Sequence, residues 1–416
     1  MTIDSQLAGA RPEEAAQPHG KSLRFASRLY VAGGQQRSLR SLTAGMDGWY
    51  EYQKGVILDL DTTTGALSTA VEYVSPPEAC PPEEPAILFK SGTLVGDLLY
   101  LSTQTEVVIY RVPSFERVAY VSLPLFNDVH HVRPTPDGNL LIANTGLDMV
   151  LETTHTGEVV NLWNVLGEDP WQRFSREVDY RRVKTTKPHL AHPNHVFYIG
   201  TEPWATRFEQ KDAISLLDPS RRIDIGLERL HDGVVHEGHV YFTTVNGNVA
   251  IADTTSLKVV EVIDLTESHP ADMLLGWARG LLIDGDYMWV GFSRIRPTKI
   301  RENVGWVLRG LKRDFGTHVG CYDIRTRKSV AQINVESSGL SAIFGIFPAP
   351  AREDAATGQL PAGNTKATSG GTLVLQALDL RYGQGTLSGG HRGVPADGAP
   401  SRALLRRLMH ATHALI

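Results

Sequence analysis

A four-strand pattern repeats along the middle of the chain, and it limits what the chain can fold into. Its clearest copy covers residues 129–163, where four short apolar runs are separated by turns such as Asp137-Gly138 and Thr156-Gly157. Short strands joined by tight Gly-containing turns are typical of antiparallel sheets. Related copies begin near Ala86, His195, Leu230 and Arg279. Such a repeat predicts several small sheets that stack or close into a ring.

The two ends of the repeat indicate how the ring closes. Three strand-like segments lie near the N-terminus, at 25–33, 56–60 and 67–73, and 342–347 can supply the missing innermost strand of that sheet. Pairing the two ends in one sheet hides strand edges. We therefore predict an all-β fold, a six-bladed β-propeller over residues 22–350. Seven blades would result if residues 372–380 also paired in the ring.

The segments outside the repeat have a different composition. Residues 1–21 are polar and rich in Pro, Glu and Ala, which predicts a disordered leader without the features of a secretory signal. Residues 351–401 are rich in Gly, Ala, Ser and Thr, which predicts a flexible tail. Residues 402–416 have the apolar spacing of a short amphipathic helix that docks on the body.

Charge and cysteine content exclude several classes of protein. The net charge of -5 and a pI near 6.3 give no basic field that would hold nucleic acid. No apolar run approaches the roughly 20 residues that span a bilayer. The two cysteines, Cys80 and Cys321, support neither a disulfide framework nor a thiolate zinc site. A cytoplasmic location is the expectation. The chain also lacks a Gly-x-Ser-x-Gly elbow, a Walker loop and a dinucleotide fingerprint.

A polar phrase recurs where the innermost strands are expected to begin. The four phrases are Val129-His130-His131-Val132, Pro193-Asn194-His195-Val196, Leu230-His231-Asp232-Gly233-Val234 and Ala278-Arg279-Gly280-Leu281. In a propeller these positions converge on the central channel. We therefore predict His130, His131, His195 and His231 as candidate ligands of a divalent metal ion, with Zn, Fe, Mn and Ni all suited to imidazole. The alternative is a metal-free site in which they bond to carbonyls and water.

Other polar residues of these phrases have candidate roles in catalysis. Arg279 is suited to bind a carboxylate, phosphate or sulfate, or to pair internally with Asp232 or Asp128. Asp232 and Asp128 are candidate bases, or partners that fix an imidazole tautomer, and His131 is a candidate general base. Asn194 is either a donor to a developing oxyanion or a turn residue.

Two long insertions are expected on the face where the innermost strands begin. Residues 164–188 contain Asp169-Pro170 followed by aromatic residues, which resembles a helix start and predicts a lid. Residues 294–318 are basic, which favours either an anionic ligand or a solvated loop. Long loops of this kind more often carry function than not.

Two motifs resemble known propellers. The stretch Gly276-Trp277-Ala278-Arg279-Gly280-Leu281 with Val290–Arg294 resembles a largely uncharacterised bacterial propeller family of secondary-metabolite and glycan gene neighbourhoods. The stretch Pro136–Gly146 is similar to blades of virginiamycin-lyase-like, arylsulfotransferase-like and gluconolactonase-like propellers. The calcium ligands of gluconolactonase-like enzymes are not matched. The resemblance implies a propeller, and the His-rich channel with Arg279 is more similar to lyases acting on uronates or lactones.

These observations predict an enzyme that acts on a small anionic or carbohydrate-like substrate at the channel mouth by lyase or hydrolase chemistry. His131, His195 and His231 would hold a divalent metal or supply the base, while Asp232 orients and Arg279 binds the anion. One alternative is a non-catalytic propeller that binds a protein or glycan. Another is a sulfotransferase-like enzyme with a covalently modified histidine.

Overall fold

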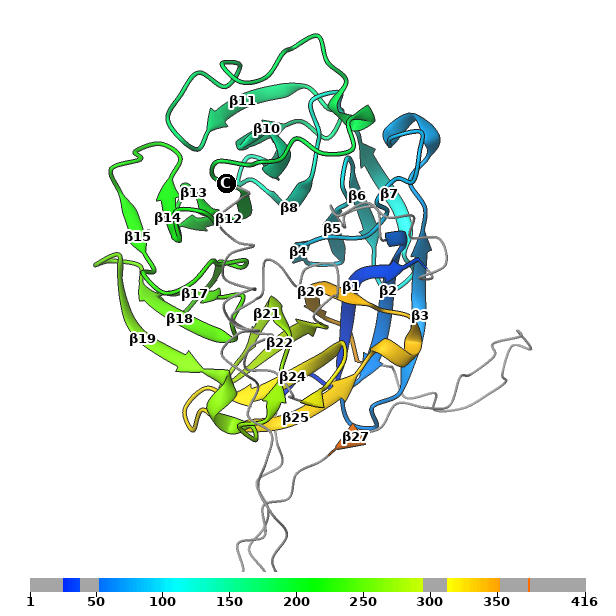
Figure 1. Cartoon of the computed structure of the whole chain (residues 1–416), viewed down its shortest axis with the longest axis vertical. Helices are drawn as coiled ribbons and strands as arrows, with labels where there is room; N and C mark the ends of the chain where they lie inside the picture. Colours follow the sequence, from blue (N-terminus) through cyan, green and yellow to red (C-terminus); the bar gives the residue numbers. More distant parts are fainter. Residues whose placement is uncertain (1–24, 38–51, 295–312, 352–372, 375–416) are drawn as a thin grey trace, which may run out of the picture. The chain divides into compact units, whose positions relative to one another are not determined.

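The repeated strands form six four-stranded antiparallel sheets arranged in a ring (Figure 1). The computed structural model describes residues 25–37, 52–294, 313–351 and 373–374, which all belong to one unit of the chain, residues 1–376. The predicted six-bladed propeller is confirmed. Each blade is formed by neighbouring strands because the connecting segments, such as Asp137-Gly138 and Glu237-Gly238, are too short for any other pairing.

Blade 1 combines both ends of the described chain, in the order β26 (Ala342–Pro348), β1 (Arg28–Gln36), β2 (Tyr52–Asp61) and β3 (Leu67–Tyr73). Blade 2 consists of β4 (Gly92–Val95), β5 (Leu98–Ser102), β6 (Val107–Arg111) and β7 (Glu116–Val121). Blade 3 consists of β8 (Val129–Pro134), β9 (Leu140–Asn144), β10 (Met149–Thr153) and β11 (Val159–Asn164).

The remaining blades follow in chain order from the channel outward. Blade 4 consists of β12 (Pro193–Ile199), β13 (Glu202–Arg207), β14 (Asp212–Ser215) and β15 (Arg222–Asp224). Blade 5 consists of β16 (Val234–His236), β17 (His239–Thr243), β18 (Asn248–Asp253) and β19 (Lys258–Asp264). Blade 6 consists of β21 (Trp277–Asp284), β22 (Tyr287–Ser293), β24 (His318–Asp323) and β25 (Ser329–Asn334).

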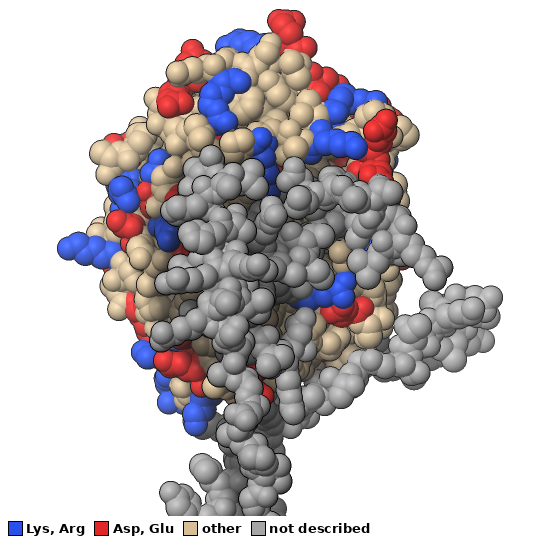
Figure 2. Space-filling view, viewed as in Figure 1, with Lys and Arg blue, Asp and Glu red and all other residues tan. Residues whose placement is uncertain are grey.

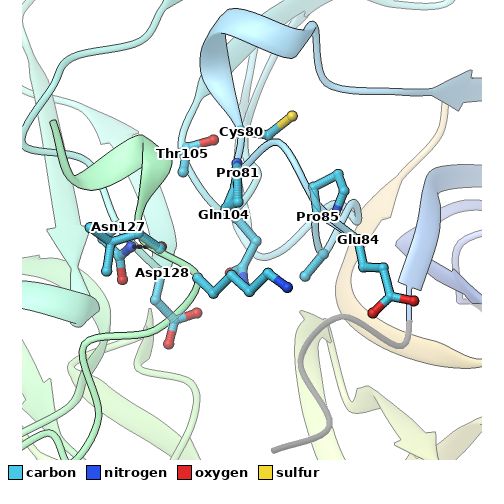
Figure 3. A pocket seen from close by; sticks show the side chains of 11 residues that line it. Cys80, Pro81, Glu84, Pro85, Gln104, Thr105, Asn127 and Asp128 are labelled. Carbon is cyan, nitrogen blue, oxygen red and sulfur yellow. Dashed lines mark hydrogen bonds between the residues drawn. The ribbon is translucent and has the colours of Figure 1, made fainter. Parts of the chain in front are cut away.

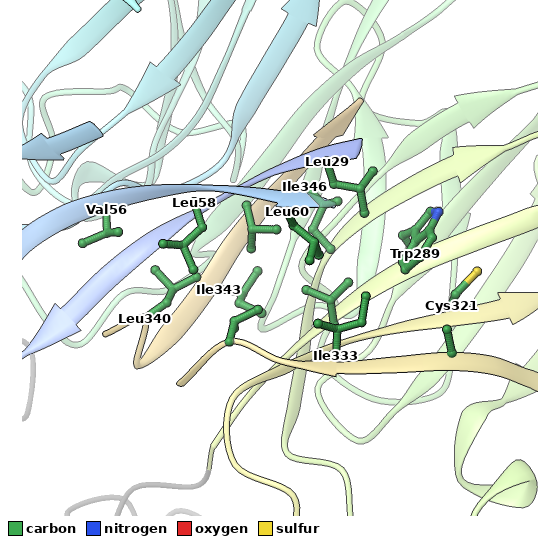
Figure 4. Packing of buried hydrophobic residues seen from close by; sticks show 14 residues of the cluster. Leu29, Val56, Leu58, Leu60, Trp289, Cys321, Ile333, Leu340, Ile343 and Ile346 are labelled. Carbon is green, nitrogen blue, oxygen red and sulfur yellow. The ribbon is translucent and has the colours of Figure 1, made fainter. Parts of the chain in front are cut away.

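Ring closure occurs in blade 1, as the sequence predicts. β26 pairs antiparallel with β1, with Val31 opposite Ile346 and Ala32 opposite Gly345. Apolar side chains of this blade pack against those of blade 6, and Figure 4 shows the cluster around Ile343, Ile346 and Trp289. Burying each such aliphatic side chain contributes roughly 1.5–3 kcal/mol. The closure therefore depends on a continuous core between the first and last blades as well as on strand pairing.

The innermost strands share an irregularity where the polar phrases lie. The pairing register shifts at this place in blades 1, 3, 4 and 6. In blade 5 an extra residue separates the Leu230–Thr244 bridge from the Val234–Tyr241 pair. A β-bulge of this kind redirects side chains. The repeated phrase is thus a repeated bulge, and it gives each blade two successive channel positions.

Hydroxyl groups on the second strands satisfy backbone groups that the bulges leave without ladder partners. Thr206 accepts a hydrogen bond from the His195 N–H at 2.9 Å, Ser102 donates to the Ser91 carbonyl at 2.8 Å, and Ser293 accepts from the Ile343 N–H at 3.0 Å. An unpaired buried backbone group is costly. These side chains therefore make the bulge compatible with a buried position.

The insertion between β11 and β12 lies beside the start of β8, on the face where the innermost strands begin, which we term the entry face. Its residues around Asp169 form turns and not the helix start that the sequence suggests, because Asp169 accepts the Trp171 N–H and closes a tight turn. A short 3-10 helix, η5 (Tyr180–Arg182), follows. Asn127 donates from its amide to the carbonyls of Tyr180 and Val183, each at 2.8 Å, and so fastens the insertion to blade 3.

Several sequence predictions concern residues outside the described ranges. The leader (1–21), most of the tail (351–401), the C-terminal helix (402–416) and residues 295–312 of the basic insertion lie there and stay predictions. The described part of 372–380, β27 (Leu373–Val374), pairs with β25 at the outer edge of blade 6, so it forms no seventh blade. A two-stranded parallel sheet joins β20 (Met273–Leu274) to β23 (Arg313–Asp314). Among the described residues, no helix is long and apolar enough to cross a membrane.

Charged side chains of both signs are interspersed over the part of the surface that Figure 2 leaves uncovered. Lys and Arg alternate with Asp and Glu around its rim, and neither sign forms a continuous field there. This agrees with the small net charge of the chain.

Candidate functional site

The bulges place two tiers of side chains in the channel. The first bulge residue of each blade lies nearer the entry face, and together these residues form the upper tier: Lys90, His130, Asn194, His231, Arg279 and Phe344. The second bulge residues form the lower tier: Ser91, His131, His195, Asp232, Gly280 and Gly345. Lys90 and Ser91 take these places in blade 2. The Lys90 N–H donates to the Ser102 carbonyl, just as the His231 N–H of blade 5 donates to the Thr243 carbonyl.

A buried ion pair lies at the centre of the upper tier. The Lys90 ammonium is fully buried and contacts the carboxylate of Asp128, which is 7% exposed and directly precedes β8. His130 Nε2 lies 3.3 Å from the same carboxylate. Burial lowers the pKa of Lys90 to about 8, although Asp128 opposes the change. Burial alone would raise the pKa of Asp128, but Lys90 and His130 hold it well below its usual value.

Arg279 provides a second buried positive charge. Its guanidinium lies 4.4 Å from the ring centre of Phe344 and 5.2 Å from that of Trp277, within the range of cation–π contacts. Arg279 and Phe344 belong to blades 6 and 1, so the contact joins two neighbouring blades. Among the described side chains here, Lys90 and Arg279 are cationic and Asp128 is anionic.

The imidazoles of the upper tier are neutral near pH 7. Burial, with Lys90, lowers the pKa of His130 to about 4, and burial, with Arg279, lowers that of His231 well below its usual value. The Nε2 atom of His231 is buried and has no hydrogen-bond partner in the described part of the chain. It can therefore accept a proton or a hydrogen bond from a ligand.

A His/Asp group that could hold a metal ion adjoins the upper tier. It consists of Asp128, His189 and His192, whose ligand atoms all lie within 4.8 Å of one another. The Nδ1 atoms of His189 and His192 are 2.7 Å apart, and the His192 ring lies edge-on to His130 with centres 5.0 Å apart. Burial lowers the pKa of both histidines, and neutral imidazoles are the forms that ligate metals. The donor set of two imidazoles and a carboxylate fits Zn, Fe, Mn or Ni.

Asp148 positions this His/Asp group. Its buried carboxylate accepts the backbone N–H groups of Leu190, Ala191 and His192 at 2.8–2.9 Å, and Arg173 pairs with it at 2.7 Å. Asp148 adopts a positive φ of 54° at the end of a 3-10 turn, which turns its side chain toward the insertion. One carboxylate thereby fixes the backbone of the segment that carries the histidines.

The lower tier is engaged chiefly in contacts between blades. His131 Nε2 donates to the Gly92 carbonyl at 3.1 Å, its Nδ1 accepts the Val196 N–H at 3.4 Å, and its ring stacks on His195 with centres 3.6 Å apart. Burial lowers the pKa of His195 to about 3 and that of His131 well below its usual value. His131 therefore joins blades 2, 3 and 4 through both ring nitrogens.

Asp232 has a comparable place on the other side of the lower tier. Its carboxylate accepts hydrogen bonds from the Thr243 hydroxyl and from the Gly280 N–H at 3.0 Å, which links blade 5 to blade 6. Burial raises the pKa of Asp232 to about 6, although these hydrogen bonds act to lower it. Asn194 has a linking role as well, because its amide donates to the Leu230 carbonyl at 2.9 Å.

The candidate residues from the sequence therefore lie in two groups. His130, His231 and Arg279 lie in the upper tier, whereas His131, His195 and Asp232 lie in the lower tier. The His/Asp group found among the described residues contains none of the four histidines predicted as metal ligands. The sequence prediction did not include Lys90 or Asp148, and it did not name His189 and His192 as candidate ligands. The available signals were the His-x-x-His-x-x-His spacing of residues 189, 192 and 195 and the position of Lys90 before β4.

A small pocket on the entry face borders Asp128 (Figure 3). Its lining includes Cys80, Pro85 and Gln104 from loops of blade 2 and Asn127 beside Asp128. Its volume of about 20 Å³ is close to what one water molecule occupies. Burial raises the pKa of the Cys80 thiol, so it lacks the character of an activated thiolate.

Comparisons with known proteins support the fold. No family model and no curated protein matches the chain. A Bacteroides caccae protein of unknown function is 13% identical with a TM-score of 0.50, covering 79% of this chain and 100% of that one. Virginiamycin B lyase from Staphylococcus aureus is 12% identical with a TM-score of 0.36, covering 57% and 73%. A structure from a nidogen/laminin complex is 8% identical with a TM-score of 0.46, covering 76% and 97%. The likeness to the Bacteroides caccae protein concerns the fold alone.

Proposed function

We propose that the protein is an enzyme that acts on a small anionic or carbohydrate-like substrate in the upper tier, by lyase or hydrolase chemistry. The observation that carries this proposal is the burial of Lys90, Asp128 and Arg279 together with neutral His130 and His231. Burying charged groups in one place costs free energy that a purely structural channel would avoid. Perturbed ionisable groups concentrated in a channel are typical of functional sites.

The residues have complementary roles in this proposal. Arg279 and Lys90 bind the anionic group of the substrate and stabilise negative charge that develops on it. His231, with its buried and unpartnered Nε2, is the general base that removes a proton from the substrate. This assignment keeps His231 and Arg279 from the sequence prediction and replaces the linking residues His131 and Asp232.

We place the metal ligands at Asp128, His189 and His192 and not at the four histidines predicted from sequence. A divalent ion held there would polarise a substrate oxygen next to Arg279 and His231. Asp148 and Thr186 would act behind the ligands, since Asp148 fixes the backbone at His192 and the Thr186 hydroxyl lies 3.3 Å from His189 Nε2.

Metal analysis of the purified full chain tests the ligand assignment. We expect about one equivalent of divalent metal in the wild type and in His155→Ala, an exposed histidine that serves as the control. His192→Ala and Asp128→Asn should lose the metal while keeping the circular dichroism of the fold. Failure of the wild type to bind added Zn, Fe, Mn or Ni would reject the metal site.

Activity assays test the base and the anion site separately. We expect turnover of a uronate, lactone or small carboxylate, followed by the ultraviolet absorbance of an unsaturated product or by released acid. His231→Ala and Arg279→Gln should each lower kcat/KM by about 100-fold or more, whereas His155→Ala should not. Binding without turnover would favour the non-catalytic propeller, and a sulfated histidine in the intact mass would favour a sulfotransferase-like enzyme.

A further inference from the structure

A second cavity occupies the opposite half of the channel. It has a volume of about 610 Å³ and is lined by residues of all six innermost strands, including Gly92, His131, His195, Asp232 and Phe347. Its lining includes lower-tier residues but none from the upper tier. The volume falls in the range of small-molecule sites. This cavity opens toward the face where the innermost strands end.

Arg133 lines this cavity, and no acidic side chain in the described part of the chain pairs with its guanidinium. It lies near the end of β8, and its guanidinium lies 5.1 Å from the ring centre of Tyr198. Among the described residues it makes no ion pair, and its buried Nε has no hydrogen-bond partner. Burial lowers its pKa, and no carboxylate contributes to the change. A largely buried guanidinium without an acidic neighbour is costly unless a ligand supplies the negative charge.

The acidic residue that lines the cavity does not neutralise Arg133. Asp232 directs its carboxylate oxygens to the Thr243 hydroxyl and the Gly280 N–H. A second polar atom also lacks a partner in the described structure, because His195 Nδ1 is buried without a hydrogen bond and the residue is only 7% exposed. Among the described residues, Arg133 therefore has no acidic partner and His195 Nδ1 has no hydrogen-bond partner.

The rest of the lining is largely apolar and defines the remainder of the ligand. Leu94, Val234, Leu281, Ile346 and Phe347 surround the cavity. We propose that this lower cavity is a separate binding site for a small organic anion, with Arg133 on its acidic group and the apolar residues on its hydrocarbon body. A planar guanidinium suits carboxylate, sulfate and phosphate alike. This site is independent of the reaction proposed for the upper tier.

Ligand binding to the full chain tests the proposal with three anionic probes and one neutral analogue. Phenylacetate, phenyl sulfate and phenyl phosphate are compared with phenylacetamide by saturation-transfer NMR and calorimetry. We expect at least one anion to bind and the amide not to bind, and the three anions distinguish the acidic groups. Arg133→Gln should weaken binding by about tenfold or more. The control Arg117→Gln removes an exposed arginine that also lies over a tyrosine, Tyr120, and should bind as the wild type does.

Two further results separate this site from the upper tier. Arg279→Gln, which removes an upper-tier guanidinium, should leave this anion binding unchanged, because Arg279 lies outside the lower cavity. If Arg133→Gln does not fold, the comparison of anions with the amide in Arg279→Gln still decides the matter. Equal binding of the amide, no binding of any anion, or unchanged binding by a folded Arg133→Gln would each overturn the proposal.

Discussion

Replacing Asp148 with alanine is expected to release the histidine segment of the insertion. The carboxylate accepts N–H groups of Leu190, Ala191 and His192 and pairs with Arg173. After the change, the Leu190 amide can reach water because that residue is exposed, and Arg173 can turn outward. The amides of Ala191 and His192 cannot, since these residues are 0% and 8% exposed. The cost therefore arises mainly from two buried donors.

The magnitude follows from those two donors. A hydrogen bond to a charged acceptor contributes roughly 1.5–3 kcal/mol, so losing two costs about 3–6 kcal/mol. Arg173→Ala removes the partly exposed ion pair, together with an exposed hydrogen bond to the Pro188 carbonyl and a contact with the Phe174 ring, and should cost about 1 kcal/mol. Asp148→Asn should fall between them, because one amide oxygen still accepts N–H groups while the amide nitrogen faces Leu190 or Arg173.

Urea unfolding and amide hydrogen exchange together measure this effect. We expect Asp148→Ala to lower the free energy of opening at the Ala191 and His192 amides by the amount above, whether the insertion opens alone or with the whole ring. The reasoning would be refuted if Asp148→Ala and Arg173→Ala had equal effects, or if exchange at these two amides did not change.

Three other predictions concern different parts of the propeller. Lys90→Met should lower the free energy of unfolding by about 3–5 kcal/mol, since it leaves the Asp128 carboxylate buried without its ammonium partner. Gly33→Ala should cost about 3 kcal/mol or more, because the new Cβ would lie 1.8 Å from the Ala342 carbonyl and separate β1 from β26. In His318→Phe, the free energy of unfolding should fall by about 3 kcal/mol less between pH 6.5 and pH 4 than it does in the wild type. Burial lowers the pKa of His318 from 6.5 to about 4, so the unfolded chain binds the proton first and stability is lost as pH falls from 6.5 toward 4.

Each of these predictions has its own control. The double variant Lys90→Met with Asp128→Leu should recover much of the loss, and an additive loss would contradict the pairing argument. Gly138→Ala adds a Cβ with no atom within 4 Å at a positive φ of 84°, so it should cost only about 1–2 kcal/mol. For His318, denaturation at a series of pH values should show a flatter profile in the variant, and parallel profiles would reject the assignment.

The fold could be predicted because its repeat is marked by local turn chemistry. Asp-Gly or Glu-Gly turns recur at the same place in blades 3, 5 and 6, and the strand at 342–347 fits the vacant inner position. One second strand, β13, is missed by the pattern because Pro203 lies within it. A proline normally argues against a strand, because it has no backbone N–H to donate. Pro203 is tolerated in β13 because it lies near the strand start, opposite Tyr198.

The candidate site could be predicted only in part. The phrases indicate which residues enter the channel, but the bulge sends His130 and His131 to different tiers, and sequence does not reveal where a bulge divides neighbours. Lys90 is missed because blade 2 has no histidine at that place. Asp148 is missed because its role depends on a positive φ and on backbone N–H groups more than 40 residues away.

The closure of blade 1 by β26 also sets the order in which the molecule can be completed during synthesis. β1 ends at Gln36 and its inner partner begins at Ala342, so the ribosome must add about 300 residues before the two can pair. At roughly 5–20 residues per second, the inner edge of β1 stays open for about 15–60 s. During that interval the nascent chain presents an unpaired, apolar strand to its surroundings. Any chain that stops before Ala342 keeps that edge permanently, and such fragments should aggregate or remain bound to chaperones.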